Sequence, residues 1–307
     1  MQNIQIGKTG IEKEYDLILR GKPGIQTQER DAEGKLVRIL DSQGAEDGED
    51  IYLSIDLKLQ DHLFKLFKNR RGALVAIDPK TGLVRALISS PSFNPNILNS
   101  IVDVKEVENL FSNKESPIFN RAVSGQYPPA STLKPFIGLA AIENEVISWE
   151  TKIEDNGKFY VEGDPRPYRG WKEYGHGKVD MRKAIAESSD VYFYNIAYDL
   201  TLSGIRPMLE SFGFGKKAGL SDSEASGLLP NKEWKLGYIG DFWFKGDTIN
   251  LGIGQGYILA TPLQLALAYS AIANKGVIYQ PQIIQPESEA SYQPKKIAEI
   301  NLSNKNA

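Results

Sequence analysis

The feature that most limits how this chain folds is a pair of short apolar runs, GALVAI at residues 72–77 and LVRALISS at residues 83–90. The segment DPKTG separates them, and in it Asp-Pro starts a turn while Gly82 permits a positive φ angle. Two apolar runs joined in this way predict a β-hairpin. Helical patterns precede and follow the hairpin, which predicts a mixed α/β (α+β) domain.

Helices are predicted on both sides of the hairpin from apolar periodicity and from cap residues. They cover residues 56–70, 131–147, 180–200 with a break at the serines, and 260–276, where Thr-Pro opens the helix and Gly276 closes it. Residues 1–47 are polar, with a turn and a strand in RDAEGKLVRIL, and the acidic segment 41–50 marks a domain boundary. The tail from residue 286 is polar and is predicted to end without a closing element.

Composition excludes several kinds of protein. The net charge of −3 gives no basic surface for nucleic acid, so no nucleic-acid partner is expected. The 307 residues contain no cysteine, which removes disulfides, thiolate nucleophiles and Cys-ligated zinc. The two histidines limit a Ser-His-Asp site: His62 lies off the apolar stripe of its helix, and His176 lies in a glycine-flanked loop. No G-x-S-x-G motif accompanies them.

The segment YPPASTLKPF contains the one Ser-x-x-Lys of the chain, Ser131 to Lys134. On a helix, positions i and i+3 share a face, so Lys134 is placed to reach the Ser131 hydroxyl. A serine needs a base to become nucleophilic, and a lysine with a lowered pKa serves as one. The competing interpretation is an N-capping serine followed by a surface lysine. The prolines around the tetrapeptide make the catalytic interpretation more specific.

A second group is Ser188-Ser189-Asp190, between two predicted helices. A Ser-x-Asp there places a hydroxyl near Lys134, where it would carry a proton toward a leaving amine. The alternative is a helix cap, because serine and aspartate are both good caps. Ser54-Ile55-Asp56 also fits the pattern. Order and spacing after Ser131 favour Ser188.

The combination of YPPASTLKPF with YRGWKEYGHGKVDMRKAIAESSDVYFYN and FKGDTINLGIGQGYILATPLQLALAYS resembles the transpeptidase domain of class B penicillin-binding proteins. Among these it is most similar to the elongation-type penicillin-binding protein 2 group, over about residues 5–285. The resemblance implies an antiparallel sheet flanked by helices, and a serine D,D-transpeptidase that cross-links peptidoglycan without a cofactor. By motif match, Ser131 is the nucleophile acylated by the D-Ala-D-Ala stem peptide or by β-lactams. Lys134 is its base, and Ser188 and Asp190 form the second motif.

The family's third motif, Lys-Ser/Thr-Gly on an edge strand, follows the other two in sequence. Lys80-Thr81-Gly82 precedes Ser131 and is interpreted as the hairpin turn, Lys8-Thr9-Gly10 lies earlier still, and Lys217-Ala218-Gly219 lacks the hydroxyl. The expectation is therefore a chain truncated at both ends. Residues 1–47 would be a remnant of the non-catalytic N-terminal (pedestal or dimerisation) domain, and residues 48–307 a transpeptidase domain without its last strands. Such a chain is expected to be weakly active or inactive.

The resemblance also implies partners and a location. The intact protein would lie at the periplasmic face of the bacterial inner membrane, beside a membrane glycosyltransferase and a rod-shape scaffold protein. Some relatives hold zinc near the second motif, which makes Asp155 and His176 candidate ligands. The positions that would complete such a site are Gly170 and Ser189, which are poor zinc ligands, so a loop histidine making hydrogen bonds is favoured and no metal is expected.

Three other functions are alternatives to the transpeptidase. A serine β-lactamase or β-lactam sensor would share Ser131 and Lys134, but no glutamate motif suited to deacylation is seen. A non-catalytic scaffold that keeps the fold is favoured only by the missing third motif. A nucleotide-binding P-loop at Lys8 fails because no glycine precedes Gly7 at the required spacing.

Overall fold

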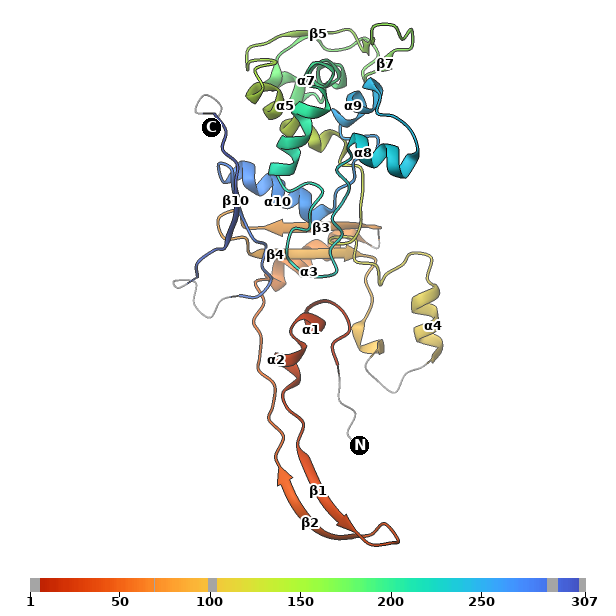
Figure 1. The fold of residues 1–307 in the computed structure, drawn as a ribbon, viewed down its shortest axis with the longest axis vertical. Coiled ribbons are helices and arrows are strands. Elements are labelled where there is room, and N and C mark those ends of the chain that lie inside the picture. The colour runs from red at the N-terminus through yellow and green to blue at the C-terminus, as the bar shows by residue number, and fades with distance from the viewer. Residues whose placement is uncertain (1–5, 69, 99–103, 286–291, 304–307) are drawn as a thin grey trace.

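The computed structural model describes residues 6–68, 70–98, 104–285 and 292–303. Figure 1 shows a helix-rich body, a hairpin across its middle, and a long arm that projects from the N-terminal part. The arm contains β1 (Ile25–Arg30) and β2 (Leu36–Gln43), and the central hairpin contains β3 (Gly72–Ile77) and β4 (Val84–Ser90). All the sheets within the described ranges are antiparallel pairs. The mixed α/β class is thus confirmed.

The central hairpin forms as its sequence predicts. Leu74 pairs with Ile88, and the alternate residues of β4 are buried. The turn is closed by the Gly82 N–H, which donates to the Asp78 carbonyl oxygen at 2.8 Å, with Gly82 at φ +76°. Helix α3 (Leu57–Phe67) packs on β4 and is capped by the Asp56 carboxylate, while α10 (Pro262–Ala273) packs on β3. Both helices were predicted, and Thr261 caps α10 reciprocally with Gln264.

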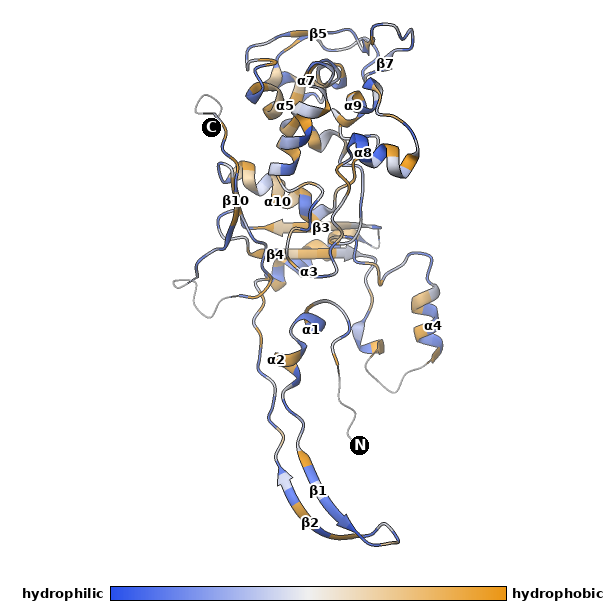
Figure 2. Ribbon diagram, in the orientation of Figure 1, coloured by the Kyte–Doolittle hydropathy of each residue, from blue (hydrophilic) through white to orange (hydrophobic). Residues whose placement is uncertain are grey.

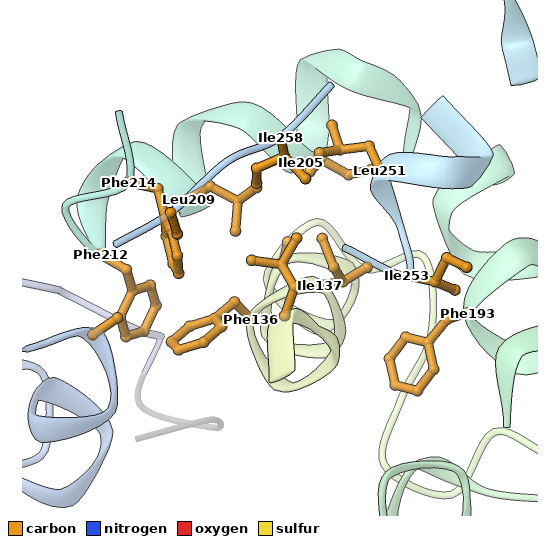
Figure 3. Packing of buried hydrophobic residues seen from close by; sticks show 14 of the residues in the cluster. Phe136, Ile137, Phe193, Ile205, Leu209, Phe212, Phe214, Leu251, Ile253 and Ile258 are labelled. Carbon is orange, nitrogen blue, oxygen red and sulfur yellow. The ribbon is translucent and has the colours of Figure 1, made fainter. Parts of the chain in front are cut away.

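The core is built around α5 (Lys134–Glu143). Phe136 packs edge-on against Phe212 and Phe214, with ring centroids 4.7 and 5.4 Å away (Figure 3). The Tyr269 ring packs against it in the same way, at 5.2 Å. Gly138 faces Met181, whose sulfur would lie 2.8 Å from an added Cβ, so a side chain there has no room. A helix that is apolar on almost every side must be surrounded by other elements, and α5 is.

The predicted helix at 180–200 is two helices, broken where the serines lie. These are α6 (Met181–Ala186) and α7 (Asp190–Ser211), and α7 is longer than the sequence pattern suggested. Thr201 has φ +60° and ψ 174°, which kinks α7 in its middle. The buried face of α7 packs along α5, so the break before α7 brings residues 187–189 close to the first turn of α5.

The N-terminal arm contains little that is buried. It comprises α1 (Gly10–Glu14), α2 (Asp16–Arg20), β1 and β2. Every residue of β2 is exposed. In Figure 2, β1 is orange at its start and blue beyond it, and β2 has orange stretches among blue ones. The predicted turn and strand at residues 30–40 are confirmed, with the strand continuing to Gln43.

The prediction for the tail was wrong. Residues Lys296–Glu299 form strand β10, which pairs antiparallel with β9 (Val277–Tyr279). The Ile300 N–H donates to the Gly276 carbonyl oxygen at 2.9 Å, and the Ile300 side chain is buried. The strand was missed because its stability comes from pairing with a segment distant in sequence, while its own composition is polar.

The remaining elements are short. They are η1 (Pro95–Leu98), α4 (Val104–Ser112), η2 (Ala130–Leu133), β5 (Ile153–Asp155), β6 (Lys158–Phe159), β7 (Tyr168–Arg169), β8 (Gly177–Val179), α8 (Lys232–Trp234), the π-helix η3 (Lys235–Ile239) and α9 (Lys245–Leu251). Within the described ranges, no helix combines the length and apolar character needed to cross a membrane.

Candidate active site

Ser131 lies in the 3₁₀ turn η2, at the start of the buried helix α5. Ala130 has φ +51°, an unusual value for a residue with a side chain, and its N–H donates to the Gly254 carbonyl oxygen at 2.8 Å. Gly254 itself has φ +70°, and a Cβ there would lie 2.1 Å from the Ala130 carbonyl oxygen. The neighbouring Thr132 carbonyl oxygen accepts the Tyr269 hydroxyl at 2.8 Å. These contacts fix a strained turn that leaves the Ser131 side chain exposed.

Lys134 is buried, with 1% of its surface exposed. Its Nζ donates to the Ser188 carbonyl oxygen at 2.9 Å, to Ser188 Oγ at 3.0 Å and to Asp190 Oδ1 at 2.7 Å. Burial lowers the pKa of Lys134 below its ordinary value, against the opposing effect of the Asp190 carboxylate. The alternative of a surface lysine behind a capping serine is therefore wrong.

Ser188 connects the lysine to the exposed serine. It lies in the break between α6 and α7 with φ +54°, and its Oγ donates to Ser131 Oγ at 2.9 Å. Among the described residues, Lys134 and Ser131 make no direct hydrogen bond, so the path between them passes through Ser188. The sequence predicted the Ser188 hydroxyl near Lys134, but not that it lies between Lys134 and Ser131.

Asp190 is the first residue of α7, and its carboxylate forms an ion pair with the Lys134 ammonium. Its second oxygen, Oδ2, accepts the backbone N–H of Trp171 at 3.2 Å. The Ser189 side chain caps α7 by accepting the Tyr192 N–H at 3.2 Å. The catalytic candidates of the second motif are thus fixed by a loop on one side and by the start of a helix on the other.

The other two candidates, Asp155 and His176, are bonded to each other. Asp155 Oδ2 lies 2.6 Å from His176 Nδ1 and accepts the Ser189 hydroxyl at 2.6 Å, while Oδ1 accepts the Gly157 N–H at 2.8 Å. Burial alone would raise the pKa of Asp155, but these three hydrogen bonds lower it below its ordinary value.

This arrangement does not fit a zinc centre. Both carboxylate oxygens of Asp155 accept hydrogen bonds, and one of these comes from the Ser189 hydroxyl. Gly170 has no side chain that could bind a metal. His176 Nε2 has no hydrogen-bond partner among the described residues, and the nearest carboxylate oxygen, on Glu187, is 3.8 Å away. In the described part of the chain, no three or more His, Cys, Asp or Glu side chains are grouped so that they could hold a metal ion.

The remaining motif-like segments have structural roles. Ser54 is buried and donates to the Val84 carbonyl oxygen at 2.8 Å, and Asp56 caps α3. Lys80 is exposed in the hairpin turn, where its N–H donates to Asp78 Oδ1 at 2.9 Å.

The two further lysine-containing triplets also lie in segments with structural roles of their own. Gly10 begins α1, after an exposed Lys8. The loop at residues 217–221 wraps the buried Glu224 carboxylate, which accepts the N–H groups of Ala218 and Gly219 at 2.6 and 3.1 Å.

Two contributors to the site were not identified from the sequence. Gly254 supports the strained turn before Ser131, and Trp171 bonds to both Ser188 and Asp190. Gly254 lies in the glycine-rich run GIGQG, a signal of close backbone approach. For Trp171 the signal was an aromatic residue in the polar loop RGWKEYGHG, which alone does not specify a role.

The fold and the site together define a mixed α/β domain that presents a serine beside a buried lysine. Residues 72–307 match the penicillin binding protein transpeptidase domain, and residues 1–53 match the penicillin-binding protein dimerisation domain. The chain belongs to the family of penicillin-binding protein transpeptidase domains.

Among curated relatives, the chain is 43% identical to the peptidoglycan D,D-transpeptidase MrdA of Acinetobacter baumannii, over 91% of this chain and 42% of that protein. It is 38% identical to MrdA of Escherichia coli strain K12, over 92% of this chain and 45% of that protein. The chain therefore spans less than half the length of these relatives.

Solved structures agree with the fold. Pseudomonas aeruginosa PBP2 in complex with WCK 5153 superposes with a TM-score of 0.84 at 36% identity, over 98% of this chain and 64% of that one. PBP2 of Helicobacter pylori, in its complex with MreC, gives a TM-score of 0.85 at 33% identity, over 96% of this chain and 54% of that one.

Proposed function

We propose that this chain carries the acylation site of a peptidoglycan D,D-transpeptidase of cell-wall elongation. The observation that carries the proposal is the hydrogen-bonded path from Ser131 Oγ through Ser188 Oγ to the buried Lys134 Nζ, with steps of 2.9 and 3.0 Å. The relatives named peptidoglycan D,D-transpeptidase support D-Ala-D-Ala stem peptides as the substrate class. The match to a penicillin binding protein domain supports β-lactams as inhibitors.

In the proposed acylation, neutral Lys134 accepts the Ser188 proton while Ser188 accepts the proton of Ser131. The Ser131 oxygen attacks the carbonyl carbon of the penultimate D-Ala, and the peptide bond breaks. The proton returns from Lys134 through Ser188 to the leaving amine of the terminal D-Ala. An amine of a neighbouring strand then attacks the ester by the same path in reverse, which forms the cross-link.

The lysine is suited to this cycle because two opposing effects act on it. Burial favours the neutral form that accepts a proton, and the Asp190 carboxylate at 2.7 Å stabilises the charged form that holds it. A base whose pKa is lowered by one effect and raised by the other can both accept a proton and return it.

The domain division, location and partners belong to the same proposal. Residues 1–47 would form part of the dimerisation (pedestal) domain and residues 48–307 the transpeptidase domain, in keeping with the two family matches. The proposed location is the periplasmic face of the inner membrane. The proposed partners are a membrane glycosyltransferase and, by similarity to the PBP2–MreC complex, a rod-shape scaffold protein.

The test is labelling of the 307-residue chain with a fluorescent penicillin, beside a Ser131→Ala variant. We expect an adduct with the full mass of the β-lactam on Ser131 and none on the variant. Absence of any adduct on Ser131 would contradict the proposal, and rapid loss of the adduct would indicate a β-lactamase instead.

A further inference from the structure

Trp171 is an exposed tryptophan that makes two hydrogen bonds to the second motif and a third to Glu187, the residue before it. Its side chain is well exposed, with 65% of the residue surface accessible, which is unusual for so large an apolar ring. Its indole Nε1–H points at the Ser188 carbonyl oxygen, 3.1 Å away, and at the Glu187 carbonyl oxygen, 3.2 Å away. Its backbone N–H donates to Asp190 Oδ2 at 3.2 Å.

These bonds meet the same two residues that hold the Lys134 ammonium. The Ser188 carbonyl oxygen accepts both Lys134 Nζ, at 2.9 Å, and Trp171 Nε1, so both of its lone pairs are used. Asp190 divides its oxygens in the same way, Oδ1 to Lys134 and Oδ2 to Trp171. Trp171 therefore fixes from outside the two acceptors that Lys134 binds from inside.

Ser188 needs such support because its backbone is strained. A residue with a side chain at φ +54° costs of the order of 1–3 kcal/mol and persists only where its surroundings hold it. If the indole N–H were absent, the Ser188 carbonyl oxygen would lose one of its two hydrogen bonds. The Ser188 hydroxyl would then be less well placed between Ser131 and Lys134.

The indole ring is in turn set by the buried network behind it. Trp171 packs edge-on against His176, with ring centroids 5.4 Å apart. His176 is fixed by Asp155, which also accepts the Ser189 hydroxyl. The ring orientation and the position of Ser188 thus depend on one continuous set of contacts.

We propose that Trp171 is a positioning residue for acylation, which holds Ser188 and Asp190 in the geometry that links Ser131 to Lys134. This inference rests on the proposed function. The group that the proposal concerns is the indole N–H, because any substitution other than proline keeps the backbone N–H that donates to Asp190.

The first experiment replaces that one group. Exchange of the Trp171 indole for benzothiophene keeps the bicyclic ring and removes only the N–H, and Trp171→Phe removes the N–H with part of the ring. We expect the acylation rate constant for fluorescent penicillin to fall roughly three- to tenfold in both, the effect of one hydrogen bond, with the dissociation constant of the initial complex unchanged. Tyr174→Phe is the matched control, since Tyr174 is exposed in the same loop and its hydroxyl makes no hydrogen bond among the described residues.

A second measurement does not depend on activity. By NMR, the Trp171 indole N–H should exchange with solvent more slowly than that of Trp149, which is also exposed and has no hydrogen-bond partner in the described ranges. An acylation rate constant within about twofold of the parent in the benzothiophene variant would overturn the proposal. So would indole exchange as fast as that of Trp149. If the parent chain takes no label at Ser131, the proposed function fails, and the exchange result alone decides whether Trp171 holds Ser188.

Discussion

The chain contains two segments of the pattern Ser-x-Asp, and only one of them reaches Ser131. Ser54 and Asp56 use their side chains to join a strand and to cap α3, and Ser54 is buried. Ser188 has the same chemistry, but its φ of +54° turns its hydroxyl between Ser131 and Lys134. Backbone strain and a buried lysine, more than the tripeptide itself, distinguish the segment that reaches Ser131 from the structural one.

The middle residues of the two segments differ in a way that explains the strain. Ile55 is a partly buried side chain packed against the core, whereas Ser189 is fully buried and donates to Asp155. A buried hydrogen-bond network beneath Ser189 can hold a neighbouring residue in a costly conformation. The structural segment has no such network in the described part of the chain and has ordinary backbone angles.

The largest expected effect comes from removing the Ser188 hydroxyl. Ser188→Ala interrupts the path between Ser131 and Lys134, so acylation by fluorescent penicillin should slow by roughly 10²–10⁴, the usual contribution of positioned proton transfer. The matched variant Ser54→Ala should acylate within about twofold of the parent and lose about 1 kcal/mol of unfolding free energy. Equal acylation rates for Ser188→Ala and the parent would show that Lys134 takes the proton directly.

The second effect concerns the network under Ser189. Asp155→Ala leaves Ser189 Oγ, His176 Nδ1 and the Gly157 N–H without their acceptor, and should lower the free energy of unfolding by about 3 kcal/mol in urea titrations. Glu154→Ala, at an exposed position of the same strand, is the control and should change it by less than about 0.5 kcal/mol.

The stability difference between the parent and Asp155→Ala is also expected to depend on pH. Because the folded-state pKa of Asp155 is lowered, its stabilisation is present above its ordinary pKa of about 4 and is lost as the pH falls through the lower folded value. The difference in stability between the parent and Asp155→Ala should therefore shrink on acidification below about pH 4. A difference that stays constant down to pH 2 would exclude the ionised carboxylate as the source.

A smaller effect is expected when the charge of Asp190 is removed. Asp190→Asn takes away the group that opposes the effect of burial, so the pKa of Lys134 should fall further below its ordinary value. The rising limb of acylation against pH should move to lower pH by about one to two units, the equivalent of one charge-assisted hydrogen bond. Asp56→Asn, which retains a good cap for α3, should leave the profile where it is. A shift to higher pH after Asp190→Asn would contradict the assignment of Lys134 as the base.

Sequence patterns predicted those parts of the molecule that depend on local chemistry. The hairpin turn at Asp78–Gly82, the cap of α10 and the break between α6 and α7 all follow from residue types within a few positions. Strand β10 and the role of Trp171 were missed, because each depends on a partner far along the chain. The order of contacts at the site was missed for the same reason, because Ser188 lies 57 residues after Ser131. The positive φ of Ser188, which places its hydroxyl beside Ser131, is not indicated by the local sequence.

The smallest effect on acylation is expected for Lys80→Ala, in the hairpin to which Ser54 donates a hydrogen bond. Lys80-Thr81-Gly82 matches the family's third motif in letters, yet Lys80 is exposed in a turn, and the Thr81 hydroxyl accepts the Leu83 N–H at 3.3 Å. Lys80→Ala should therefore change the acylation rate by less than about twofold and the unfolding free energy by less than about 0.5 kcal/mol, as for other exposed positions. Gly82→Ala in the same turn is the contrasting variant, because Gly82 has φ +76° and an added Cβ would lie 2.4 Å from the Gln280 carbonyl oxygen. It should cost more than about 1 kcal/mol of unfolding free energy. A large loss of acylation in Lys80→Ala without loss of stability would mean that this lysine binds substrate. A sequence match alone would then indicate a functional residue, whereas the two Ser-x-Asp segments indicate that local geometry decides.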